Sequence, residues 1–340
     1  MKITPFSQLL IFILMLCFVG IRAQDDTTMY KVSVTKYLMG TTVETTARST
    51  DVNYCKKALL AAYEEMQRVE NLLSCEKDSS EISVINRASG ITPVKVSYET
   101  LEMLKRARSY CKKYNGTFDV TIGPLSDLWG FNQDKEIVLP EDKTIKNLKK
   151  LVNYKDMIIN ENDTTVFLKK KGMAIDLGGI AKGYAIDRGS TVLKEMGITN
   201  FILNAGGDIY VSGTKDKETL WRIGIKHPRN TNDLVAEFDL KDYAVATSGD
   251  YERFKIINGK RYHHILDPAT GYPGRLSESS TILATTAEEA DATATYVFLL
   301  GWQKTLSDKN IDYPCLIVSS DGTIHYNQTF EKNYNLELVK

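Results

Sequence analysis

The stretch Ala174-Ile-Asp-Leu-Gly-Gly-Ile-Ala-Lys-Gly-Tyr-Ala-Ile-Asp187 has the order of a short apolar strand, a glycine turn and the start of a helix. Gly178 and Gly179 let the backbone approach a ligand without a Cβ in the way, and the N-terminus of the next helix directs N–H groups toward an anion. Lys182 adds a movable positive charge. The spacing differs from the GxxxxGK(S/T) of a P-loop and from the GxGxxG of a dinucleotide-binding turn. The stretch predicts a phosphate-binding turn, and the surrounding chain decides the fold class.

Short strands follow this turn, and helices stand apart from them. Segments with the composition and alternation of strands are Phe201–Leu203, Leu220–Ile225, Val235–Phe238, Ala244–Ala246, Phe254–Ile257, Tyr262–Leu266 and Thr281–Leu283. Helical spacing returns from Ala287 to Leu300, with Thr285 or Thr286 as N-cap and Gly301 just past the end. Clustered strands beside segregated helices predict an α+β fold, a single mixed domain with antiparallel-rich sheets, rather than a doubly wound α/β sheet.

The first part of the domain reads as a hairpin followed by two helices. Polar and apolar residues alternate over 30–35, and a β-branched run resumes at Thr41 after Met39-Gly40, which predicts a bend at these two residues. Helical spacing covers residues 58–73 and 98–114. We expect the two helices to pack together on a sheet.

The N-terminus has the form of an export signal. A charged Met1-Lys2 precedes an apolar run from Phe6 to Gly20, which is short for a transmembrane span. We expect residues 1–23 to be a signal peptide and the protein to be exported to the periplasm. Cleavage after Ala23 would release a soluble form, whereas lipid attachment at Cys17 would anchor the protein to a membrane.

Residues 24–340 are expected to form one domain, because no linker, repeat or block of like charge divides them. Lys plus Arg equals Asp plus Glu at 43 each, which argues against a nucleic-acid partner. The spacing of Cys55, Cys75, Cys111 and Cys315 fits no zinc pattern. Some of them could pair in an exported protein, but we predict no catalytic cysteine.

Several groups of residues suggest chemistry. Asp291 and Thr295 lie four apart on the last long predicted helix and so offer two hard oxygen ligands from one face, which suits Mg²⁺; the alternative is a buried polar pair within the helix. His264 stands beside the Asp267-Pro268 turn, where it could act as an acid or base, although the segment also reads as a simple turn.

The order of motifs resembles the ApbE family of FAD:protein FMN transferases over nearly the whole mature chain. The matching segments, quoted by their first residues, are Met39-Gly-Thr, Asp119-Val-Thr-Ile-Gly-Pro-Leu, Asp176-Leu-Gly-Gly-Ile-Ala-Lys-Gly-Tyr-Ala, Asn204-Ala-Gly-Gly-Asp, Thr247-Ser-Gly-Asp-Tyr-Glu-Arg, His264-Ile-Leu-Asp-Pro-Ala-Thr-Gly and Glu289-Ala-Asp-Ala-Thr-Ala-Thr. The resemblance implies an ApbE-like, T-fold-like domain.

The resemblance also implies a reaction and a set of site residues. FMN would pass from FAD to a Ser or Thr hydroxyl of an acceptor protein, with Mg²⁺ on the pyrophosphate and AMP as the leaving group. The acceptor class would be a flavoprotein subunit of a membrane redox complex. The implied metal ligands are the Gly179 carbonyl, Asp291 and Thr295. Catalysis is assigned to His264 together with Asp291, and FAD contacts to Met39, Thr117, Phe118, Asp119, Lys182 and Ile265.

Two positions depart from the family pattern. Cys75-Glu76 stands where many members carry an aromatic that stacks on the flavin, and Ala294 stands where some carry a second acid. The second change argues against a two-metal hydrolase. Two alternatives to the transferase stay open: an enzyme that hydrolyses FAD to FMN and AMP, and a non-catalytic periplasmic FAD-binding protein.

Overall fold

The computed structural model describes residues 28–131, 138–216, 218–230 and 232–339. Its framework is an eight-stranded antiparallel sheet in the order β1-β2-β6-β7-β10-β13-β14-β15. The strands are β1 (Tyr30–Leu38), β2 (Thr41–Ser49), β6 (Phe201–Ala205), β7 (Asp208–Ser212), β10 (Tyr243–Gly249), β13 (Ser277–Ala284), β14 (Cys315–Ser319) and β15 (Ile324–Tyr326). The predicted first hairpin is confirmed, because Met39 and Gly40 both take the positive φ that a tight two-residue turn requires.

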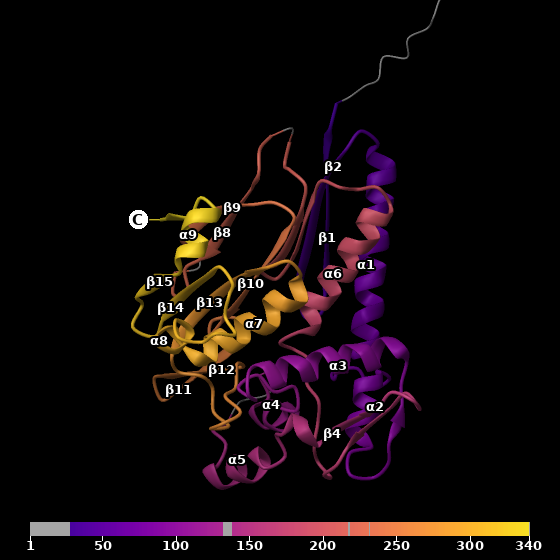
Figure 1. The fold of residues 1–340 in the computed structure, drawn as a ribbon, viewed down its shortest axis with the longest axis vertical. Helices are drawn as coiled ribbons and strands as arrows, with labels where there is room; N and C mark the ends of the chain where they lie inside the picture. The colour runs from indigo at the N-terminus through magenta and orange to yellow at the C-terminus, as the bar shows by residue number, and fades with distance from the viewer. Residues whose placement is uncertain (1–27, 132–137, 217, 231, 340) are drawn as a thin grey trace, which may run out of the picture.

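Three helices cover one face of this sheet: α1 (Val52–Leu73), α6 (Ala181–Glu195) and α7 (Ala287–Leu300). In Figure 1, α1 and α6 run side by side and α7 crosses in front of the strands. Successive strand residues point to opposite faces, so Ala244 and Ala246 pack under the helices while Val245 packs on the other side. Small residues on the helix side let α7 lie close to the sheet.

A second, smaller sheet covers the opposite face. It contains β8 (Trp221–Lys226), β9 (Leu234–Leu240) and β16 (Glu337–Leu338), with α9 (Gln328–Asn333) beside it. Phe238 and Phe330 meet edge to face in the apolar layer between the sheets. The result is a helix layer, a large sheet and a small sheet, which confirms the predicted α+β class.

The remaining elements are α2 (Glu81–Arg87), β3 (Val94–Lys95), α3 (Tyr98–Lys113), α4 (Gly123–Trp129), α5 (Asp142–Lys149), a 3-10 turn (Tyr154–Asp156), β4 (Met157–Asn160), β5 (Thr165–Leu168), β11 (Phe254–Ile257), β12 (Lys260–His263) and α8 (Trp302–Thr305). In Figure 1, α2, α3, α4, α5 and β4 make up the lower part of the molecule, whereas α8 lies higher, beside α7. A separate apolar cluster built on Leu125, Trp129 and Ile145 joins α4 and α5 to β12.

Two local predictions are wrong. The stretch that begins at Ala174 is not a strand: Ala174 makes an isolated bridge to Ile122, and Asn86 bonds both the N–H and the carbonyl of Ile175 in place of a neighbouring strand. The predicted strand Tyr262–Leu266 ends at His263. The His264 N–H still donates to the Arg253 carbonyl beside β11 at 3.1 Å, but the Ile265 N–H turns back to His263 Nδ1 at 3.3 Å.

Other predictions on the chain ends and cysteines have mixed outcomes. The predicted signal peptide, residues 1–23, and Cys17 lie outside the described residues. Among the residues that the structure does describe, no helix combines the length and apolar character needed to cross a membrane. The four cysteines in the described part of the chain are free thiols, and Cys55, Cys111 and Cys315 are buried.

Candidate active site

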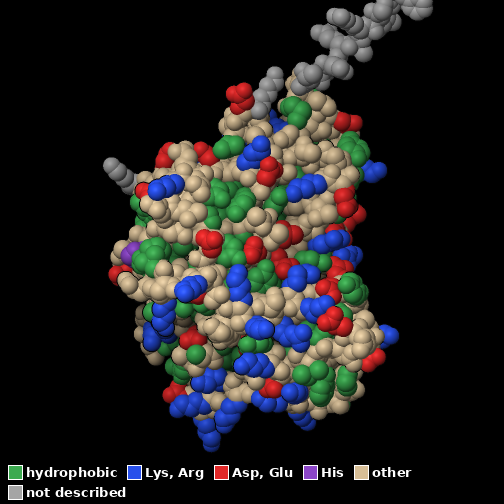
Figure 2. Space-filling view, viewed as in Figure 1, with side chains coloured by type: hydrophobic (Ala, Val, Ile, Leu, Met, Phe, Trp, Pro, Cys, Tyr) green, Lys and Arg blue, Asp and Glu red, His purple; other side chains and the backbone are tan. Residues whose placement is uncertain are grey.

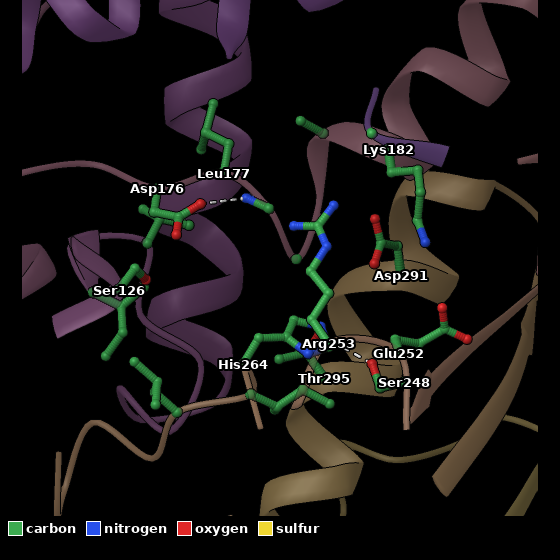
Figure 3. A pocket seen from close by; sticks show the side chains of 18 of the residues that line it. Ser126, Asp176, Leu177, Lys182, Ser248, Glu252, Arg253, His264, Asp291 and Thr295 are labelled. Atoms are coloured by element: carbon green, nitrogen blue, oxygen red, sulfur yellow. Dashed lines mark hydrogen bonds between the residues drawn. The ribbon is translucent and has the colours of Figure 1, made fainter. Parts of the chain in front are cut away.

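A cavity of about 400 Å³ opens where the helix layer meets the lower part of the molecule (Figure 3). Segments far apart in the sequence line it: the β1–β2 turn, the loop after α3, the glycine turn before α6, the end of β10, the segment after β12, and α7. All the predicted site residues lie in its wall, namely Met39, Thr117, Phe118, Asp119, Gly179, Lys182, His264, Ile265, Asp291 and Thr295.

The three residues predicted to hold a metal lie together. Asp291 and Thr295 project from the same face of α7 into the cavity. A Cβ placed on Gly179 would stand 3.1 Å from Thr295 Oγ1 and 3.2 Å from Phe118 Cε2, so the glycine keeps the space between the turn and the hydroxyl open. Ser248 adds a second hydroxyl, 3.3 Å from Thr295 Oγ1.

The carboxylate of Asp291 is held in an unfavourable electrostatic position. Its side chain is buried, and burial first, then the nearby Asp208 carboxylate, raises the pKa of Asp291 to about 8. Lys182 and an N–H from Gly183 oppose this rise. Lys182 itself pairs with Asp208 at 2.8 Å; burial lowers its pKa, but Asp208, Asp291 and Glu252 together raise the pKa above its ordinary value. Two buried carboxylates therefore share a single ammonium group here.

The start of α6 does not leave its amides free in the way the sequence suggested. The Gly183 N–H donates to Asp291 Oδ2 at 3.0 Å. One of the first amides of the helix therefore positions a protein carboxylate and is not free to bind a ligand anion. Asp187, farther along α6, accepts the N–H groups of Ala287 and Glu288 at 2.8 and 2.9 Å. It thereby caps α7, the helix that carries Asp291. No local pattern in the sequence predicts this link.

His264, predicted to act as an acid or base, lies at the cavity wall with a pKa far below that of an ordinary imidazole. Burial, followed by the positive charge of Arg253, lowers the pKa of His264 to about 3. The imidazole is therefore neutral at physiological pH, and its Nδ1 is buried with no hydrogen-bond partner among the described residues. Its neighbour His263 has a structural role, since its Nε2 bonds the Gly274 carbonyl at 2.8 Å.

Asp119 was predicted to contact FAD, but both of its oxygens have protein partners. Oδ1 accepts the backbone N–H and the hydroxyl of Thr121 at 2.8 and 2.7 Å, and Oδ2 accepts the N–H of Tyr154 at 2.9 Å. The carboxylate thus ties together the loop that follows α3. This geometry favours a positioning role over direct contact with a ligand.

Several polar residues of the cavity were not assigned from the sequence, although some belong to the quoted motifs. They are Glu70, Cys75, Glu76, Ser126, Asp176, Asp208, Ser248, Glu252 and Arg253. Asp208 is the most informative, because it ends the glycine turn that begins at Asn204 and reaches Lys182 across the cavity. Its position after two glycines was the available signal.

The donor set fits a hard divalent cation. A carboxylate, two hydroxyls and a glycine turn offer oxygen atoms of the kind that Mg²⁺ prefers, and a cation would offset the charge that burial penalises on Asp291. In the part of the chain that the structure describes, no three His, Cys, Asp or Glu residues gather to hold a metal. A cation here would therefore need hydroxyl, carbonyl and substrate oxygens besides Asp291.

Comparison with known proteins identifies the family of the chain. The profile of the ApbE family matches residues 39–313, which is most of the sequence. The chain belongs to the ApbE family. A protein of Klebsiella pneumoniae named FAD:protein FMN transferase is 33% identical over 246 residues, covering 71% of this chain and 75% of that protein. A protein of Treponema pallidum with the same name is 32% identical, covering 73% and 72%.

Solved structures agree with this membership. The crystal structure of the ApbE protein from Thermotoga maritima superposes with a TM-score of 0.83 at 36% identity, covering 89% of this chain and 98% of that one. The flavin transferase ApbE from Vibrio cholerae gives a TM-score of 0.78 at 28% identity, covering 89% and 99%. The α+β fold described above is therefore the fold of ApbE proteins.

Proposed function

We propose that this chain is an FAD:protein FMN transferase that uses Mg²⁺, joins FMN to a Ser or Thr hydroxyl of an acceptor protein and releases AMP. The observation that carries the proposal is the convergence of Asp291, Thr295, Gly179 and Lys182 with the neutral His264 on one cavity. Phosphoryl-group transfer requires that negative charge on phosphate oxygens be neutralised and that a hydroxyl be placed in line with the phosphorus. The cavity offers groups for both needs.

The carboxylate of Asp291, the hydroxyl of Thr295 and the carbonyl of Gly179 would hold the Mg²⁺. When bound, the ion supplies charge neutralisation on the pyrophosphate oxygens. Lys182 brings a second positive charge to the same region, and Asp208 holds its ammonium at 2.8 Å. Met39, Thr117, Phe118 and Ile265 would line the space for the rest of FAD.

His264 would accept the proton of the acceptor hydroxyl. The hydroxyl oxygen would then bond to the FMN phosphorus, while the bond from that phosphorus to the oxygen that leaves with AMP breaks. A neutral imidazole with an unpartnered buried nitrogen has a lone pair to offer for this step. Its pKa is low in the protein alone, because burial and Arg253 disfavour the cation. An anionic pyrophosphate beside the ring would raise that pKa and make the imidazole a stronger base.

The cellular setting is part of the same proposal. The N-terminal segment has the composition of an export signal, so the enzyme would act in the periplasm, either soluble after cleavage at Ala23 or attached to a membrane through Cys17. The acceptor would be the flavin-carrying subunit of a membrane redox complex, which exposes its hydroxyl on the same side of the membrane.

The test combines the mature protein, FAD, Mg²⁺ and such an acceptor subunit expressed without its membrane anchor. We expect flavin fluorescence on the denatured acceptor in a gel, one AMP released per FMN attached, and loss of both when EDTA removes the metal. Transfer that proceeds equally well in EDTA would contradict the Mg²⁺ site.

The same assay separates the alternatives. AMP released without acceptor, at the rate seen with acceptor, would identify an FAD hydrolase. Tight retention of FAD with no AMP under either condition would identify a flavin-binding protein without catalytic activity.

A further inference from the structure

The β11–β12 hairpin projects beside the cavity and is continuous with its wall. Arg253 and His264, the residues that flank the two strands, both line the cavity, and the His264 N–H donates to the Arg253 carbonyl at 3.1 Å. Any macromolecule that brings a group to His264 must therefore pass close to this hairpin.

Helix α5 shares an apolar cluster with the hairpin and lies against the turn that follows β12. Ile145 and Leu148 of α5 share one apolar cluster with Ile257 and Tyr262 of the hairpin. Lys149 Nζ also donates to the Ala269 carbonyl at 2.8 Å, which ties α5 to the turn after β12. We call the outer side of these two elements the α5–hairpin surface.

The α5–hairpin surface is strongly cationic. It carries Lys143, Lys146, Lys149, Lys150, Lys255, Lys260 and Arg261. Arg275, from the segment after β12, adds its guanidinium 5.0 Å from the centre of the Tyr262 ring of the hairpin. The acidic residues of the same elements and of the turn after β12 are Glu141, Asp142 and Asp267. Figure 2 shows Lys and Arg side chains gathered at the lower end of the molecule, where Figure 1 places α5. Because the whole chain has equal numbers of basic and acidic residues, this excess is local.

Apolar side chains are exposed within the same surface. Phe254 and Ile256 are 37% and 56% exposed, and the Arg261 guanidinium lies over the Phe254 ring at 3.8 Å. An apolar centre with a charged rim is typical of protein interfaces, in which apolar contacts give affinity and charges guide approach.

We propose that the α5–hairpin surface is the docking site for an acidic face of the acceptor protein; this inference rests on the proposed transferase function. The surface is continuous with the cavity wall at Arg253 and His264, where the acceptor hydroxyl has to arrive. Its positive charge selects a partner with a negative one, and its exposed apolar side chains give that partner a contact to bury. Docking here presents the acceptor to His264.

Paired charge reversals test this surface without touching the cavity. The variants are Lys143→Glu with Lys146→Glu on α5, and Lys255→Glu with Lys260→Glu on the hairpin; these side chains are exposed and do not line the cavity. The matched control is Lys56→Glu with Lys57→Glu, exposed in the first turns of α1. The assay measures KM separately for FAD and for the anchor-free acceptor subunit, at low and at high salt.

Each reversed pair on the surface is expected to raise KM for the acceptor by about tenfold at low salt, with KM for FAD unchanged. High salt should reduce the difference in acceptor KM between these variants and wild type, because salt screens exposed charges. For the neutral pair Lys255→Gln with Lys260→Gln, KM for the acceptor should lie between the values of wild type and of the reversed pair. The α1 control should have the KM of wild type. Unchanged acceptor KM in both surface pairs, or an equal rise in the control, would overturn the proposal.

Two further arms separate this proposal from its rivals. If wild type transfers no FMN, the proposed function fails, and binding of the unmodified acceptor to the same variants by biolayer interferometry still tests the docking site. Co-sedimentation with phosphatidylglycerol vesicles tests a bilayer as the partner. Vesicle binding that the reversals abolish, with acceptor binding and KM unchanged, would overturn the proposal in favour of a membrane contact.

Discussion

Asp291 is a carboxylate that the folded protein places where its own charge is costly. It is buried beside Asp208, and Lys182, the Gly183 N–H on Asp291 and the Thr247 N–H on Asp208 partly offset the two negative charges. Burial raises the pKa of Asp291 to about 8, so without a cation the carboxyl binds a proton near neutral pH. Such an arrangement is expected where a cation completes the site during function.

The neutral state of His264 leads to a specific prediction. Replacing His264 with Gln removes the basic nitrogen and keeps a polar side chain of similar reach. The rate of transfer should fall by about 10²–10⁴-fold, the usual contribution of a positioned general base. FAD affinity, measured by flavin fluorescence quenching, should change little. A loss of FAD affinity as large as the loss of rate would show that His264 binds FAD rather than moving a proton.

Individual residues could be predicted to different degrees. Asp291 and Thr295 follow from helical spacing, because positions four apart share a face wherever the helix packs. Asp208 required the fold, since its pairing with Lys182 depends on the β6–β7 turn coming next to α6. The pKa of His264 could not be foreseen, because burial and the proximity of Arg253 are set by tertiary packing.

At the scale of elements, α6 crosses α7 at very short range. A Cβ on Gly183 would stand 2.2 Å from the Ala287 carbonyl oxygen, so only glycine permits this approach. The same contact places the Gly183 N–H on Asp291. Gly183, which follows Lys182, therefore serves helix packing and site geometry at once, a role that the sequence analysis did not assign to it.

Replacing Gly183 with Ala should destabilise the protein by about 1–3 kcal/mol, because the clash is with backbone that cannot rotate away. It should also weaken transfer by displacing Asp291. The matched control is Gly189→Ala on the same helix, where the new Cβ would meet the flexible Met66 side chain at 3.1 Å. Thermal unfolding of both variants is the measurement, and equal losses of stability in the two would contradict the packing argument.

Elements were predicted well where the apolar pattern is regular and poorly where side chains replace strand pairing. The hairpin at Met39-Gly40 and the helix with Thr286 as N-cap are confirmed. The expected strand at Ala174 was wrong because Asn86, distant in sequence, bonds both backbone groups of Ile175. Such a long-range side-chain bond leaves no local pattern to read.

At the scale of the whole molecule, a charged network joins three helices. Arg68 of α1 bonds Glu65 on the same helix and Glu99 of α3, each at 2.8 Å, and Arg188 of α6 bonds Glu65 at 2.8 Å. Hydrogen bonds from Arg68, then Arg188, lower the pKa of Glu65 to about 2. The pKa of Glu65 in the folded protein lies below its ordinary value of 4.5. The stabilisation from this network is therefore present above about pH 4.5 and is lost as the pH falls toward 2.

Replacing Glu65 with Gln should therefore lower the unfolding temperature by roughly 2–4 °C at neutral pH, the effect of about 1 kcal/mol in a protein of this size. The difference from wild type should shrink as the pH falls from about 4.5 to about 2. Glu64→Gln, an exposed carboxylate on the same helix, is the control and should have little effect at any pH. A difference between wild type and Glu65→Gln that stays constant with pH would contradict the network.

The most direct test of the account replaces Asp291 with Ala and weighs the acceptor subunit by intact mass spectrometry after incubation with FAD and Mg²⁺. Wild type should add one FMN to the acceptor, and the variant, although folded by circular dichroism, should add none. An acceptor fully loaded with FMN by Asp291→Ala would contradict the assignment of Asp291 and of the cation site built around it.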